Sequence, residues 1–220
     1  MEQRIMRVTG KGRLRLKPDL TRITMTLEGT FSEYEETLKR SSEDTEGLRT
    51  LMAELGFAGS DLKTVSFQVD TVYESVQDEH HNYKQQFVGY QFTHVCKVEF
   101  DSDNTLLGKV LYGLANASVS PQIVIGYTVK DAEGAKNALL GNAVADAKAK
   151  AQVLAQAAGV TLKDIQKIDY SWGELDLEVN PMRRMTLAKS CAVANSYDMN
   201  IEPDDIQVSD TVTVEWEIEG

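Results

Sequence analysis

Imidazole and carboxylate side chains cluster at one place in the sequence, formed by Asp78, Glu79, His80 and His81. Neutral imidazole is a good ligand for zinc or copper, and carboxylate oxygens can complete such a site. Successive side chains of a strand point apart, so these four could converge only in a loop. Their polar neighbours indicate a solvated hairpin loop, which is the stronger interpretation. We therefore predict no metal site and keep the four residues as weak candidates.

His94 and Cys96 are a second pair of residues that could be catalytic. They share one face of an alternating segment, where the imidazole could act as a base beside a nucleophilic thiolate. Phe92, Val98 and Phe100 line the same face, and apolar surroundings raise the pKa of a thiol and make it unreactive. We therefore predict a packed core. No Gly-x-Ser-x-Gly or His-Glu-x-x-His signature occurs, so the sequence predicts no catalytic residue, no enzymatic activity and no cofactor.

The segment Gly10-Lys11-Gly12 is not a phosphate loop, because a P-loop ends in Gly-Lys-Ser/Thr at the start of a helix and here a strand follows. Met6, Val8 and Leu14 alternate with basic residues around it, which is typical of a half-buried strand. Both glycines fall on the inward face. They indicate a bulge or the close approach of another backbone.

One-sided alternation of this kind recurs in segments 23–31, 65–73, 92–100, 123–129 and 212–218, with a short seventh strand at 165–170. In the third strand, Val65, Phe67, Val69 and Tyr73 are expected to face inward. Pro18-Asp19 predicts a hairpin between the first two strands. Strands that are apolar on one face favour antiparallel sheets covered by helices.

Three segments supply the expected helices: 34–55, a second one starting near Asp103, and an alanine-rich one over 131–158 that Gly159 ends. The predicted fold class is therefore α+β, with antiparallel sheets covered on one face by helices in the order β-β-α-β-β-α-β-α-β-loop-β. A chain of 220 residues suits a single domain. The alternative is two intimately packed sub-lobes, about 1–100 with 206–220, and 101–205.

Composition excludes several classes of protein. Hydrophobic residues make up 42% and charged residues 26%, which is globular usage, and the net charge of −11 has the wrong sign for a nucleic-acid-binding protein. The longest apolar run has about four residues, so we expect no membrane insertion. The start of the chain has no signal-peptide core, which predicts a soluble, cytoplasmic protein as written. A processed or recombinant start would instead allow a periplasmic or extracellular location.

The charge is unevenly placed along the chain. The first thirty residues are net basic, whereas all the charged residues in 190–220 are Asp or Glu. Arg13, Arg15 and Lys17 lie on the outer face of the first strand, and Glu215 and Glu217 on the outer face of the last. Cross-strand pairs of opposite charge contribute roughly 0.2 to 1 kcal/mol each. These two groups could meet in one sheet or between subunits, or they could form two separate solvated faces.

Segment 171–203 follows neither the helical nor the strand period. It contains Trp172, Met182 and Met185, which would suit an adaptable contact surface if they were exposed. An equally strong alternative is a covering flap, or a short strand around 191–197, packed on its own subunit.

The ordered motifs of the chain resemble the SIMPL domain family, which includes bacterial periplasmic immunogens and oxidative-stress defence proteins. The resemblance rests on residues 8–12 followed by Lys17-Pro18-Asp19, on Asp61-Leu62-Lys63-Thr64, on Gly89-Tyr90, and on the Ala-rich 143–159. It implies an α+β fold, a tendency to form homo-oligomers that are sometimes ring-like, and no catalytic residues to carry over. Eukaryotic relatives include a signalling adaptor, so the resemblance also implies protein interaction.

We therefore expect a non-enzymatic protein that acts through homo-oligomerisation and interaction with a protein partner, in a stress- or envelope-related context that the resemblance suggests. One alternative is a small-ligand-binding protein or enzyme with a site under the 171–203 loop. Another is a protein that takes up anionic ligands through its basic first strands.

Overall fold

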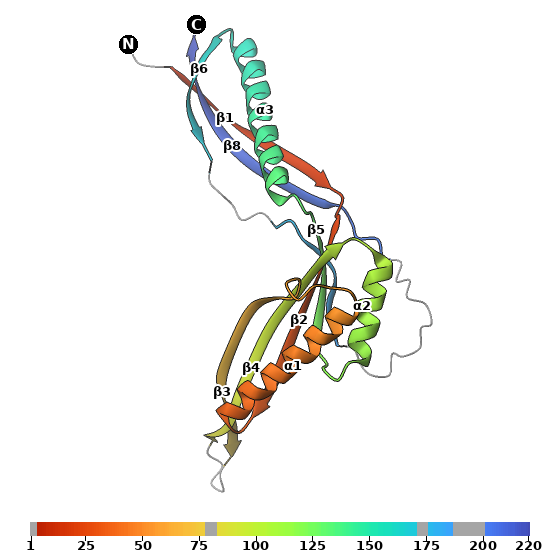
Figure 1. The fold of residues 1–220 in the computed structure, drawn as a ribbon. Helices are drawn as coiled ribbons and strands as arrows, with labels where there is room; N and C mark the ends of the chain where they lie inside the picture. The colour runs from red at the N-terminus through yellow and green to blue at the C-terminus, as the bar shows by residue number, and fades with distance from the viewer. Residues whose placement is uncertain (1–3, 78–82, 171–175, 187–200) are drawn as a thin grey trace. The chain divides into compact units, whose positions relative to one another are not determined.

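The structure is a computed structural model that describes residues 4–77, 83–170, 176–186 and 201–220, with residues 182–186 described by their backbone only (Figure 1). It has a mixed α+β fold with two antiparallel sheets, which confirms the predicted fold class. The elements in chain order are β1 (Ile5–Leu16), β2 (Leu20–Phe31), α1 (Tyr34–Glu54), β3 (Lys63–Gln77), β4 (Tyr83–Asp101), α2 (Asn104–Asn116), β5 (Gln122–Thr128), α3 (Ala132–Ala158), β6 (Thr161–Asp169), β7 (Val179–Thr186) and β8 (Ile206–Glu219).

The chain divides into two compact units, and each unit contains one sheet. The first unit comprises Met1–Asp19, Thr128–Val179 and Asp204–Gly220, and the second comprises Leu20–Tyr127 and Asn180–Pro203. These boundaries differ from the sub-lobes considered for the sequence, 1–100 with 206–220 and 101–205.

The first unit is a three-stranded sheet in the order β1-β8-β6, with α3 packed on one face (Figure 1). Its core is formed by valines and a tryptophan of the sheet against alanines of the helix: Val8, Val212, Val214, Trp216, Ala143, Ala147 and Ala151. The Asp131 side chain accepts a 2.8 Å hydrogen bond from the Gly134 backbone N–H at the start of α3. Gly159 ends the helix with φ 68°, a left-handed conformation that favours glycine.

The glycines of β1 allow α3 to lie directly on the strand. A Cβ atom added at Gly10 would lie 2.7 Å from Cβ of Ala147, and one added at Gly12 would lie 3.1 Å from the backbone N of Ala143. The pairing of β1 with β8 keeps an unbroken register through both glycines. Of the two interpretations left open by the sequence, the close approach of another backbone is therefore correct.

The predicted hairpin of the first two strands is wrong. β1 pairs with β8, from Ile5 opposite Glu217 to Leu16 opposite Ile206, whereas β2 pairs with β4 in the other sheet. Asp19 explains the path between them. Its backbone N–H donates to the Thr128 carbonyl oxygen at 3.1 Å, and its carboxylate accepts from the Lys130 N–H at 2.8 Å. These bonds hold Asp19 beside the end of β5 and the residues that follow it. Residues 17–19 therefore do not form the tight turn of a hairpin.

The second unit is a five-stranded sheet in the order β3-β4-β2-β5-β7. Helix α1 packs on β2 and β4, and α2 contacts α1. Asp103 begins α2 by accepting a 2.8 Å hydrogen bond from the Thr105 N–H. The side chains that fill this core are fully buried and come from β2, β4, β5, α1 and α2: Ile23, Met25, Leu48, Met52, Phe92, Val98, Leu107, Val110, Ile123 and Ile125.

The expected loop between the last two strands contains β7, at one edge of the five-stranded sheet. Pro181 lies within it and lacks a backbone N–H, so β7 does not read as a strand in the sequence and is suited to an edge position. The short strand considered around 191–197 lies outside the described residues.

Candidate functional surfaces

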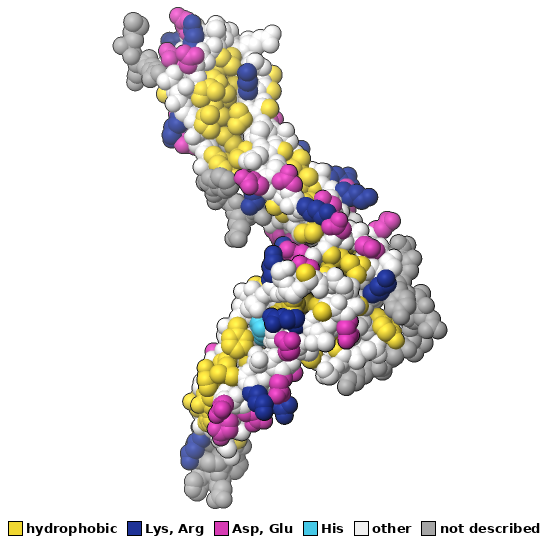
Figure 2. All heavy atoms as spheres, in the orientation of Figure 1, with side chains coloured by type: hydrophobic (Ala, Val, Ile, Leu, Met, Phe, Trp, Pro, Cys, Tyr) yellow, Lys and Arg dark blue, Asp and Glu magenta, His cyan; other side chains and the backbone are white. Residues whose placement is uncertain are grey.

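A group of aromatic side chains lies where β3 and β4 extend along α1, and we call it the aromatic ribbon. It comprises Tyr34, Phe67, Tyr73 and Phe87, which are exposed, and Tyr90, which is partly buried. Phe67 is 47% exposed and Tyr73 is 54% exposed. Figure 2 shows hydrophobic side chains gathered here beside the one visible imidazole. The inward orientation predicted for the third strand is therefore wrong for most of its apolar residues.

Four rings of the ribbon contact one another edge to face, and the fifth, Phe67, contacts the imidazole of His94 edge to face. Ring centroids are 5.4 Å apart for Tyr34 and Tyr90, 5.3 Å for Tyr90 and Phe87, and 5.6 Å for Phe87 and Tyr73. Such pairs are favourable beyond their buried area, so the rings are held in place before any partner binds. The ribbon is thus a preorganised apolar surface.

The two sheets differ in how their edges are covered. Side chains of α3 bind the outer main chain of β1: Lys150 Nζ donates to Thr9 O at 3.4 Å, Asn142 Nδ2 donates to Arg13 O at 3.4 Å, and Asp146 Oδ2 accepts from Lys11 N at 2.7 Å. β3 is an edge strand as well, and over its segment 66–72 no described side chain covers the outer main chain in this way. An uncovered edge can pair with another strand.

His94 and Cys96 lie behind the ribbon, and their predicted place in the core is confirmed. Cys96 is 1% exposed and His94 is 8% exposed. The Thr45 hydroxyl donates to the Ser41 carbonyl oxygen at 2.7 Å, so its 2.9 Å bond with His94 is donated by Nδ1–H. The other imidazole nitrogen, Nε2, is therefore the acceptor, 2.9 Å from the Thr64 hydroxyl and 3.4 Å from the Cys96 thiol.

Burial determines the protonation of this pair. Desolvation, followed by the positive charge of Arg49, lowers the pKa of His94 and keeps the imidazole neutral. Desolvation also raises the pKa of the Cys96 thiol. A hollow of about 260 Å³ outside them is lined in part by Leu38, Arg49 and Phe67. A neutral imidazole with both nitrogens bonded and a protonated thiol form a structural network and no activated nucleophile.

The terminal strands lie side by side, but their two charged groups do not face each other. The register places Arg13 opposite Ser209 and Arg15 opposite Gln207, while Glu217 is opposite Ile5. Both groups lie toward the C-terminal ends of their own strands, β1 and β8. Antiparallel pairing places those two strand ends at opposite ends of the β1–β8 pair. Lys17 follows the last residue of β1.

The charged groups of these strands have other partners. Arg15 Nε lies 2.6 Å from Asp205 Oδ2, and Arg7 Nε lies 3.6 Å from Glu215 Oε1. Glu217 accepts a 3.4 Å hydrogen bond from the Gln166 side chain. Of the arrangements left open by the sequence, the pairing of the two groups within one sheet is therefore not formed, and their pairing between subunits stays a prediction.

The remaining candidate metal-binding and contact residues lie outside the described residues, or have side chains that are not described. Asp78, Glu79, His80, His81 and Trp172 are outside the described residues, and the side chains of Met182 and Met185 are not described. In the part of the chain that is described, no group of three or more His, Cys, Asp or Glu side chains could hold a metal ion. None of the described helices is both long enough and apolar enough to cross a membrane.

The aromatic ribbon is the feature that reasoning from sequence missed. The alternation of β3 predicts a face but does not say whether a helix covers it. The polar residues on either side of 78–82, which the sequence analysis assigned to a hairpin loop, are in strands: β3 extends to Gln77 and β4 begins at Tyr83, so both strands continue beyond their apolar segments.

The family assignment follows from a comparison with protein-family models. The SIMPL model, described as a protein of unknown function (DUF541), matches residues 6–216 and so includes all three helices and all or most of every strand described above. No curated protein gave a significant match. The resemblance drawn from the ordered motifs is confirmed, and the chain belongs to the SIMPL family.

Proposed function

We propose that this protein acts without catalysis, through homo-oligomerisation and protein interaction, and that the aromatic ribbon is the contact surface. The carrying observation is the exposure of Phe67, Tyr73 and Phe87 on one preorganised surface. Tyrosine and phenylalanine are enriched at protein interfaces, and contiguous exposed apolar groups mark interaction sites. A stress- or envelope-related context is proposed on the family resemblance alone.

A second copy of this chain is the partner we propose for the ribbon. β3 carries bulges between Thr64 and Ser66 and between Val72 and Tyr73, and the segment 66–72 between them is a regular edge. Antiparallel pairing of this edge with the same edge of another copy makes an isologous contact, in which each copy supplies the same residues. Such a contact extends the sheet and brings the two ribbons together.

The test is the oligomeric state of the chain and of a ribbon variant, measured by size-exclusion chromatography with light scattering. We expect the unmodified chain to form a discrete multimer and the double variant Tyr73→Lys, Phe87→Lys to be a monomer with an unchanged circular dichroism spectrum. Tyr112→Lys is the matched control, because Tyr112 is 49% exposed on α2, outside the ribbon. It should leave the multimer intact. A monomeric unmodified chain, or a multimer that survives the double substitution, would contradict the proposal.

The alternative of a ligand-binding or catalytic site under the 171–203 segment concerns residues that are largely outside the described ranges. No observation on the described residues favours it, so we do not propose it.

A further inference from the structure

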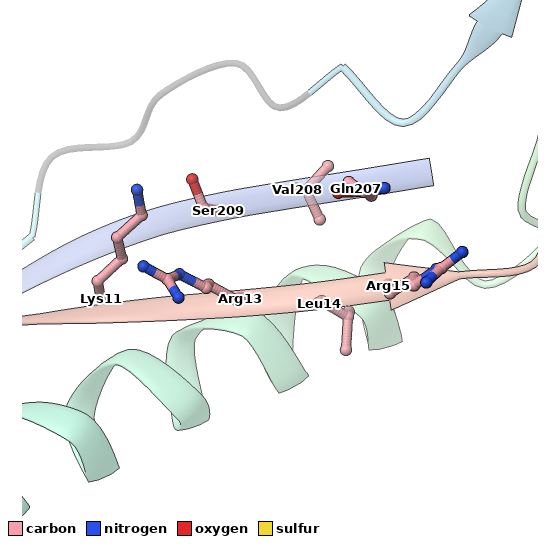
Figure 3. Close-up of a pocket in the computed structure, with 7 residues that line it drawn as sticks. All are labelled: Lys11, Arg13, Leu14, Arg15, Gln207, Val208 and Ser209. Atoms are coloured by element: carbon pink, nitrogen blue, oxygen red, sulfur yellow. The ribbon is translucent and has the colours of Figure 1, made fainter. Parts of the chain in front are cut away.

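The outer face of β1 and β8 contains a hollow of about 480 Å³, on the side of the sheet away from α3 (Figure 3). The residues that line it come from these two strands: Lys11, Arg13, Leu14, Arg15, Gln207, Val208 and Ser209. It is an open hollow on the sheet surface and not an enclosed cavity. The first unit alone supplies the whole hollow.

The strand period places the cations of the hollow together. Lys11, Arg13 and Arg15 occupy alternate positions of β1, so their side chains leave the same face at intervals of roughly 6.6 Å. Figure 3 shows Lys11 and Arg13 on the side opposite α3. The register adds neutral hydrogen-bonding groups beside each of them, Thr211 opposite Lys11, Ser209 opposite Arg13 and Gln207 opposite Arg15.

The lining contains three cations and no carboxylate. Asp205 binds Nε of Arg15 from outside the lining. Asp146 accepts hydrogen bonds from the ammonium group of Lys150 and the main-chain N–H of Lys11, and these bonds, with a smaller contribution from the charge of Arg13, lower its pKa. Among the described residues, the side chains of Lys11 and Arg13 form no ion pair within 4.0 Å. The hollow is therefore a local positive region in a chain whose net charge is −11.

We propose that this hollow binds a small oligophosphate, meaning a molecule with at least two linked phosphate groups. Guanidinium groups hold phosphate oxygens through paired N–H donors, and a lysine ammonium adds a point charge. The Ser209 hydroxyl and the Gln207 amide can donate to the remaining oxygens. With cations at successive intervals along β1, adjacent phosphates can each contact a different side chain.

A small anion fits this surface better than an acidic peptide does. An extended peptide gains affinity by pairing with the main chain of a sheet edge. The edge of β1 is already occupied by Asn142, Asp146 and Lys150 of α3, so such a peptide would have only side-chain contacts. A compact oligophosphate needs no main-chain partner on β1.

Isothermal titration calorimetry of the full chain with sodium tripolyphosphate at low ionic strength tests the proposal. We expect saturable binding at one site per chain, and weaker binding of orthophosphate. The double variant Lys11→Gln, Arg13→Gln should lose at least about tenfold in affinity, the effect of removing charge-assisted hydrogen bonds. The matched control is Lys39→Gln, Arg40→Gln on α1, which removes the same charge from the second unit and should bind normally.

Three results would overturn the proposal: no saturable heat, an equal loss of affinity in both double variants, or hexaglutamate competing as well as tripolyphosphate does. Equal losses would show diffuse attraction, and hexaglutamate competition would show a surface for acidic peptides. Ser209→Asp provides a second variant, because it places a carboxylate in the hollow and leaves both cations in place. It should weaken binding as well. The hollow belongs to the first unit and the aromatic ribbon to the second, so a failure of this proposal can be distinguished from a failure of the proposed function.

Discussion

At the scale of single residues, His94 shows how burial can turn a reactive pair into a structural one. Its neighbours Thr45 and Thr64 bond both ring nitrogens, and the bond from Thr45 to the Ser41 carbonyl fixes which nitrogen carries the proton. The Cys96 thiol then lies beside the unprotonated nitrogen. The sequence predicted the apolar surroundings of this pair, but it contained no sign of the two threonines, because they come from α1 and β3.

The lowered pKa of His94 predicts a pH dependence of stability. The folded chain keeps the imidazole neutral, so the unfolded chain binds an extra proton as the pH falls through the ordinary pKa of 6.5. The free energy of unfolding should therefore decrease as the pH falls from about 7.5 to about 5.5. Urea unfolding at a series of pH values measures this decrease.

The control for this prediction is His94→Gln, which keeps polar groups at the site and cannot titrate there. Its free energy of unfolding should depend less on pH over the same interval. Carboxylates elsewhere in the chain contribute equally to both proteins, so an identical pH dependence in the variant would contradict the role assigned to His94.

At the scale of elements, the contact of α3 with β1 depends on small residues on both sides. Ala143 and Ala147 of the helix lie on Gly10 and Gly12 of the strand. The sequence predicted this helix, its alanine face, its end at Gly159 and the close approach at the glycines as one of two possibilities. Only the unbroken pairing of β1 with β8 excluded a bulge.

Substituting Gly10 with Ala should destabilise the first unit. The added Cβ would clash with the carbonyl oxygen of Ala143 and with the backbone N and Cβ of Ala147. Both residues belong to α3, which is packed on the sheet and cannot move away freely. Overpacking of this kind costs roughly 1 to 3 kcal/mol. Chemical denaturation measures the change in the free energy of unfolding.

Gly141→Ala is the matched control, because Gly141 is an exposed position of the same helix with nothing within 4 Å of an added Cβ. It should stabilise the chain by roughly 0.5 to 1 kcal/mol, since glycine in a helix interior is unfavourable relative to alanine. The close-packing argument would be refuted if both substitutions changed stability in the same direction.

For β3, the sequence predicted the strand correctly but not the burial of its side chains. Its period of two was correctly read as a strand, but Phe67 and Tyr73 are exposed. Alternation arises from the strand geometry, whereas burial depends on how far the covering helix reaches. α1 packs on β2 and β4, and β3 lies beyond them at the edge of the sheet.

At the scale of the whole molecule, the first unit is assembled from three separated segments of the chain. β8 is its central strand, with β1 on one side and β6 on the other. The second unit has a core of its own, built from β2, β4, β5, α1 and α2. The structural role of the last segment is therefore confined to the first unit.

Ending the chain at Pro203 should unfold one unit selectively. Loss of β8 removes the partner of both β1 and β6 and half of the core against α3. Amide hydrogen exchange should show lost protection in Thr128–Val179 and retained protection in Leu20–Tyr127. The full-length chain is the control, and loss of protection in both ranges would show that the units do not fold independently.

The sequence by itself determined most of the strands with one apolar face, the three helices, the ends of the first and third helices, the family, and the burial of His94 and Cys96. These features follow from local rules, because residue type and spacing set the period of a strand or helix and the residues that end it. The tertiary structure decided which strands pair, that Arg15 meets Asp205 and not the acids of β8, that β3 leaves its aromatic side chains exposed, and that three cations line one hollow. Those features depend on contacts between residues far apart in the chain, which no local period encodes.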